Sequence, residues 1–144
     1  MAFRVYDVKE EKWIQDDIYM SPNGELFKIK QSLFGMIKVS MILDADRYVY
    51  HESARLWDKN GTEVHEGDYI KANVGWLEGE EHDDNEKRIE IGLVSYAEEL
   101  SSYIILCGNS NTFYTLGSSV SSEIEVIGNV FDGYATTDGE IKYE

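Results

Sequence analysis

The stretch LWDKNGTEVHEGDYIKA, residues 56–72, combines a turn signal, a short acidic stretch and the start of a β-strand. Asn60 and Gly61 favour a tight turn because both residue types tolerate a positive φ. Gly67 permits a second sharp change of direction, and Asp68 can accept main-chain hydrogen bonds beside it. The sequence therefore predicts that this stretch is the joint that begins the first strand of a small β-barrel.

Two chemical interpretations of the same stretch compete with the structural one. Residues 58–63 are similar to the start of a calcium-binding loop, but that loop needs Gly at its sixth position and Glu at its twelfth, where this chain has Glu and Tyr. His65, Glu66 and Asp68 would suit a metal pair, or a general base with its orienting acid. A zinc site needs three or four ligands at a recognisable spacing, which the sequence does not supply. We therefore expect no metal, no cofactor and no catalytic residue.

The chain around this joint alternates apolar and polar residues with a period of two, the pattern of half-buried strands. Residues 1–50 predict four or five strands, and residues 13–20 lead through a hairpin turn at residues 21–24 into residues 26–30. From Glu66 onward, five strands are joined mostly by short links, a number that closes into a small, partly open barrel. The main predicted strands are residues 3–6, 26–30, 36–43, 47–50, 69–76, 88–96, 103–107, 112–116 and 124–131.

This pattern predicts a mainly β protein with an N-terminal antiparallel β unit, residues 1–55, and a C-terminal small barrel, residues 56–144. Gly92 and Gly128 fall inside predicted strands, where a barrel needs bends or a close approach of two backbones. The tail from residue 132 shows no convincing periodic pattern, so no strand is assigned to it.

The charge balance limits the partners of the protein. Thirteen basic residues against twenty-eight acidic ones give a net charge of -15, which repels nucleic-acid phosphates and anionic membranes. The N-terminus has no long apolar stretch, so we expect no signal peptide, no membrane span and a cytoplasmic location. Cys107 lies alone in an apolar run, which predicts a buried thiol in a reducing compartment.

Residues 78–86 carry the strongest local negative charge of the sequence. Such a loop would suit a divalent cation or imitate a phosphate backbone, although charge runs of this kind are usually solvated. Aromatic side chains would offer a stacking surface to nucleic acid, but no basic groove accompanies them, so positions in the core and its rim are expected instead. The aromatic residues in question are Tyr48, Tyr50, Trp57, Tyr69 and Trp76.

Three segments, in this order, resemble the YopX-like family of small phage and prophage proteins. They are FRVYD at residues 3–7, the joint at residues 56–68, and EVIGNV at residues 125–130. The family usually has a Thr-Gly pair just before the Leu, where this chain has Ala54 and Arg55. The resemblance implies a mainly β protein with an SH3-like barrel in its C-terminal half. It implies no reaction, ligand or catalytic residue, so we expect structural roles for Asp58, Asn60, Gly61, Glu66, Gly67, Asp68, Gly128 and Asn129.

Three functions follow from these observations. The one that we favour is a non-enzymatic phage accessory protein whose barrel binds a host or phage protein, because the sequence offers a scaffold and no assembled chemistry. The second is an acidic mimic of DNA that occupies a nucleic-acid-binding protein. The third is an enzyme or metal protein that uses His65, Glu66 and Asp68. We expect no direct contact with nucleic acid or membrane, and the sequence leaves the oligomeric state open.

Overall fold

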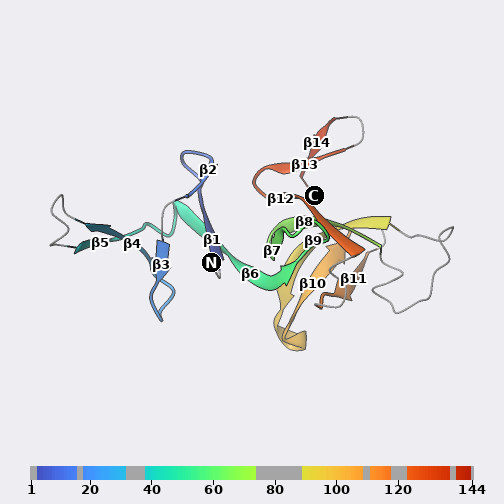
Figure 1. The fold of residues 1–144 in the computed structure, drawn as a ribbon, viewed down its shortest axis with the longest axis horizontal. Coiled ribbons are helices and arrows are strands. Elements are labelled where there is room, and N and C mark those ends of the chain that lie inside the picture. The colour runs from blue at the N-terminus through green and yellow to red at the C-terminus, as the bar shows by residue number, and fades with distance from the viewer. Residues whose placement is uncertain are drawn as a thin grey trace. The chain divides into compact units, whose positions relative to one another are not determined.

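The computed structural model describes residues 3–15, 18–31, 38–73, 89–108, 111–117, 123–136 and 139–143 (Figure 1). The chain divides into two units, one of residues Phe3–His51 and one that begins at Glu52. The division thus falls four residues before the predicted boundary at residue 55. Strands dominate both units, so the prediction of a mainly β protein is confirmed. Among the described residues, no helix is long and apolar enough to cross a membrane.

The Phe3–His51 unit is built from short antiparallel strands. Its strands are β1 (Phe3–Asp7), β2 (Lys12–Trp13), β3 (Ile18–Met20), β4 (Leu26–Gln31), β5 (Lys38–Ile42) and the first part of β6 (Tyr48–Trp57). β3, β4 and β5 form one sheet, and Met20 pairs with Leu26 across the predicted hairpin turn. Val5, Ile18 and Leu26 are the buried residues of this unit's apolar core.

The second unit contains a seven-stranded antiparallel sheet in the order β11-β10-β9-β8-β12-β13-β14. Figure 1 shows that this sheet is curled. The fifth of these strands along the chain, β12, returns to pair with the first, β8. The bounds are β7 (Glu63–His65), β8 (Asp68–Asn73), β9 (Ile89–Ala97), β10 (Ser102–Cys107), β11 (Thr112–Thr115), β12 (Ile124–Asn129), β13 (Gly133–Ala135) and β14 (Ile141–Lys142).

The core of this unit lies on the inner face of the curled sheet. Ile70, Val94 and Ile105 are fully buried there, and Leu56 from β6 and Val64 from β7 pack in the same cluster. Cys107 is buried among these residues, so the predicted buried thiol is confirmed. Burial raises the pKa of this thiol to about 11, with a smaller contribution from the nearby carboxylate of Glu90.

Several strands differ from the sequence prediction. β6 runs over ten residues instead of the predicted 47–50, and β2 and β3 are two short strands where one hairpin segment was expected over residues 13–20. No strand was predicted at the positions of β7, β13 and β14. β7, β13 and β14 are only two or three residues long, which is too short to display a period of two. They form because a neighbouring strand supplies hydrogen-bond partners, a cause that local sequence does not reveal.

Candidate functional site

Asp58 closes the first turn of the predicted joint and also ties it to a distant strand. This residue is 5% exposed. Its Oδ1 accepts hydrogen bonds from the backbone N–H groups of Asn60, at 2.9 Å, and Thr62, at 2.8 Å. Its Oδ2 accepts one from the N–H of Val126 on β12, at 2.9 Å. One carboxylate therefore shapes the turn and fixes its place beside β12.

Gly67 forms the second turn, where the chain passes from β7 into β8. Its φ is 84°, in the left-handed region that favours glycine. Its N–H donates to the carbonyl of Val94 on β9, at 2.9 Å, and its own carbonyl accepts from the N–H of Val130, also at 2.9 Å. Beside it, the fully buried Asp68 accepts the N–H of His65 at 2.8 Å. This turn therefore joins the segments of β7, β8, β9 and β12.

The remaining residues of the predicted motif lie along the same strand pair. Gly128 pairs with Tyr69, and Asn129 pairs with Asp68, so the third family-like segment meets the joint across β12 and β8. Asn129 Oδ1 accepts the N–H groups of the two residues 131 and 132 at 3.0 Å, which starts the turn into β13. Glu66 is half-buried, and burial raises the pKa of its carboxyl, helped by the nearby Glu52 carboxylate.

The side chains named in the metal or catalytic alternative make different contacts. His65 Nε2 lies 3.4 Å from an oxygen of Glu63, whereas Asp68 is directed at the main chain. In the part of the chain that the structure describes, no three His, Cys, Asp or Glu side chains are grouped as a metal site would need. Residues 78–86 lie outside the described residues, so cation binding there and imitation of DNA stay predictions.

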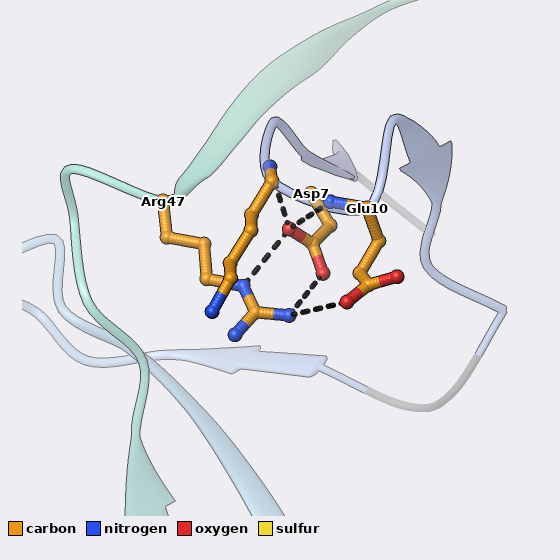
Figure 2. Close-up of polar contacts among 4 residues, drawn as sticks. Asp7, Glu10 and Arg47 are labelled. Carbon is orange, nitrogen blue, oxygen red and sulfur yellow. Dashed lines mark hydrogen bonds and ion pairs between the residues drawn. The ribbon is translucent and has the colours of Figure 1, made fainter.

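A buried carboxylate in the Phe3–His51 unit was not predicted from the sequence. Asp7 is 2% exposed and receives two hydrogen bonds from Arg47, Nε to Oδ1 at 2.9 Å and Nη2 to Oδ2 at 2.8 Å (Figure 2). Its Oδ1 also accepts the N–H groups of Lys9, at 3.0 Å, and Glu10, at 3.2 Å. The two partners are 40 residues apart in the sequence, so no local spacing indicates the pair.

This pair has a clear electrostatic effect and lines a hollow. The hydrogen bonds from Arg47 hold the pKa of Asp7 well below its usual range, against the smaller opposing effect of burial. The same contact raises the pKa of Arg47. A hollow of about 580 Å³ lies beside the pair, with Lys12, Trp13 and Lys28 in its wall. Because Asp7 and Arg47 are bonded to each other, we interpret the pair as a structural anchor within its unit.

Acid is expected to weaken this anchor. A carboxyl with a lowered folded pKa stabilises the fold at neutral pH, and this contribution is lost as the pH falls below the ordinary carboxyl range near about 4. Between pH 5 and pH 2, urea midpoints should therefore fall more steeply for the wild type than for Asp7→Asn. Glu25→Gln, which removes an exposed carboxylate of the same unit that is not among the groups acting on Asp7 or Arg47, is the control and should keep the wild-type slope. Equal slopes for all three proteins would contradict the role of the pair.

An apolar row lies on the outward face of the seven-stranded sheet. Leu93, Leu106 and Phe113 are paired in register across β9, β10 and β11, and their strand neighbours point into the core. Leu106 is 44% exposed and Phe113 is 54% exposed, while Leu93 is half-buried. A hollow of about 180 Å³ lies against the row. It is lined by Tyr69, Ile91, Gly92, Leu93, Leu106 and Gly108.

The aromatic residues considered for stacking take different positions. Tyr69 is buried, with its ring 4.9 Å from that of Tyr134 at an angle of 64°. Tyr48 is half-buried and lies 5.1 Å from the guanidinium of Arg47. Two others are exposed, Tyr50 and Trp57, and residue 76 lies outside the described residues. Tyr69 thus has the core position that was expected.

Comparisons with known proteins agree with the family-like segments. The model of the YopX protein family matches residues 2–133. The crystal structure of protein yopX from Bacillus subtilis is similar, with 15% identity, a TM-score of 0.57 and coverage of 91% of this chain and 93% of that one. Protein EF1440 from Enterococcus faecalis has 19% identity, a TM-score of 0.49 and coverage of 90% and 92%. No significant similarity to a curated protein was found. Since the family match spans most of its length, the chain belongs to the YopX protein family.

Proposed function

We propose that the protein is a non-enzymatic interaction module of a phage or prophage, acting in the cytoplasm of the host cell, and that β8 to β12 form an SH3-like barrel. The return of β12 to pair with β8 supports the barrel, because it is how five strands approach closure. Asp58 and Asp68 support a scaffold, since both carboxylates accept main-chain N–H groups of the turns beside them. Our proposal concerns a binding surface on this scaffold.

The apolar row is the observation that carries the proposed function. Leu106 and Phe113 stand side by side on a β-sheet face and are about half exposed. Burying one fully exposed side chain of this size contributes about 1.5–3 kcal/mol, so covering these two half-exposed side chains contributes about 1.5–3 kcal/mol in all, a factor of about ten to one hundred in affinity. The net charge of -15 favours a partner with basic residues around its own apolar contact.

The test compares capture of partners by surface variants. Tagged wild-type protein, Leu106→Ser and Phe113→Ser are used to recover proteins from host lysate, and the recovered proteins are identified by mass spectrometry. We expect one basic partner that the wild type retains and both variants lose, with affinities at least about tenfold weaker. Leu100→Ser is the control, because Leu100 is 48% exposed in the 3-10 helix Glu98–Leu100, outside the row.

The test requires that the variants differ from the wild type in partner binding and not in folding. All three substitutions lie at exposed positions, so circular dichroism and melting temperature should match those of the wild type. A partner that binds the wild type, Leu106→Ser and Phe113→Ser equally well would show that the apolar row is not the binding surface.

A further inference from the structure

A third hollow, of about 290 Å³, lies at the end of β8 and the starts of β9 and β12. Asn73 on β8 pairs with Ile89 on β9, and Lys71 pairs with Glu125 on β12. Ala72, which lies between them, belongs to the core, so Asn73 and Lys71 share the outward face with the apolar row. The lining used below consists of Lys59, Lys71, Asn73, Ile89, Glu123 and Glu125.

Asn73 contributes to this lining a hydrogen-bond acceptor that has no partner among the described residues. The residue is only 4% exposed, and its Oδ1 has no hydrogen-bond partner among the described residues. Buried polar atoms are nearly always paired, because an unpaired one carries the cost of its lost hydration. A buried acceptor in the wall of a hollow indicates that the hollow receives a group with an N–H or O–H donor.

The charged groups around Asn73 limit which kind of chemical group can supply that donor. Lys59 Nζ lies 2.9 Å from Glu125 Oε2, so these two charges balance each other. Glu123 is half-buried and forms no ion pair within the described part of the chain. The wall on the β9 side is Ile89, which is 48% exposed. Besides the exposed Lys71, the groups left without a partner in the described structure are therefore an acceptor, a carboxylate and an apolar surface.

We propose that this hollow receives an arginine side chain of the partner protein, an inference that rests on the proposed function. A guanidinium presents several N–H groups in one plane, so it can donate to Asn73 Oδ1 and to the Glu123 carboxylate together. Its aliphatic stem packs on Ile89. A lysine ammonium is a more strongly hydrated point charge, which fits a half-buried polar wall less well. Lys71 is exposed and lies opposite Glu125 in the strand register.

The test is a titration of the whole protein with N-acetyl-arginine methylamide, followed by the backbone amide signals in NMR spectra. We expect saturable shifts at Asn73, Ile89 and Glu123, with a Kd in the millimolar range. The citrulline analogue keeps N–H donors but lacks the charge, and it should bind at least tenfold more weakly. The lysine analogue should also bind more weakly than the arginine compound.

Three variants locate the contact. Asn73→Leu removes the acceptor and keeps the same branched shape and number of side-chain heavy atoms, so it should abolish binding without lowering the melting temperature. Glu123→Gln should weaken binding about tenfold. Glu99→Gln removes an exposed carboxylate in the 3-10 helix and should leave the affinity unchanged.

Two results would overturn this inference. One is the absence of saturable shifts at Asn73 and Glu123, and the other is equal affinity for the citrulline and arginine compounds. Either result would leave the proposed function intact if the captured partner still depends on Leu106 and Phe113. If arginine binds as expected but no partner depends on those two residues, the proposed function fails and the hollow remains a binding site.

Discussion

Replacing Gly128 by Ala is expected to lower the free energy of unfolding by at least about 3 kcal/mol, near the upper end for a single added methyl group. A Cβ at Gly128 would lie against the carbonyl oxygen of Gly133, well inside van der Waals contact, and 2.9 Å from the Cβ of Tyr134. Both belong to β13, which pairs with this part of β12. On its other side Gly128 pairs with Tyr69 on β8, so β12 cannot move away without breaking a second ladder.

Urea unfolding followed by tryptophan fluorescence measures this loss. Gly117→Ala is the matched control, because a Cβ at Gly117 meets nothing within 4 Å and its φ is not in the left-handed region. Its free energy of unfolding should stay within about 0.5 kcal/mol of the wild type. A folded Gly128→Ala variant that loses less than about 1 kcal/mol would show that β12 and β13 can separate enough to admit a methyl group.

Gly128 also shows which part of a structural feature can be predicted from the sequence alone. A glycine inside an alternating strand pattern indicates a bulge or a close approach of two backbones, and this much was predicted. The approaching backbone could not be named, because β13 is three residues long and has no readable period. The pairing shift between Val126 and Gly128 likewise depends on β8, which lies more than fifty residues earlier in the chain.

The joint divides in the same way into a local part and a remote part. Turn chemistry is local, so Asn60, Gly61 and Gly67 could be recognised from their neighbours. The bond from Val126 to Asp58 spans 68 residues and the pair of Asp7 and Arg47 spans 40, and no pattern in one sequence encodes either. Long-range anchors of this kind follow from the folded topology and were therefore missed.

The apolar row could not be predicted from the sequence for a different reason. Alternation reveals two faces of a strand, but it identifies the core face only when the other face is polar. The run at residues 103–107 is apolar on both faces, since Ile105 and Cys107 enter the core while Leu106 points outward. Only the packing of Leu56 and Val64 on one side of the sheet decides which face is buried.

Replacing Asp58 by Ala should cost about 3 kcal/mol or more, because it leaves three main-chain N–H groups without their acceptor. Asp58→Asn distinguishes the hydrogen bonds within the turn from the hydrogen bond to β12. If its oxygen takes the place of Oδ1, Asn60 and Thr62 keep their bonds, while the new amide group faces the N–H of Val126, donor against donor. We expect this variant to lose about 1–3 kcal/mol.

Amide hydrogen exchange distinguishes the two variants of Asp58 residue by residue. In Asp58→Asn, the Val126 amide should exchange much faster while those of Asn60 and Thr62 stay protected, whereas Asp58→Ala should expose all three. Asp44→Ala is the control, because the exposed Asp44 accepts a single local N–H through its side chain. Its loss should stay below about 1 kcal/mol, since water can replace an exposed acceptor. Equal losses for Asp44→Ala and Asp58→Ala would mean that the link from the turn to β12 adds nothing to the fold, and that each strand holds its place by pairing alone.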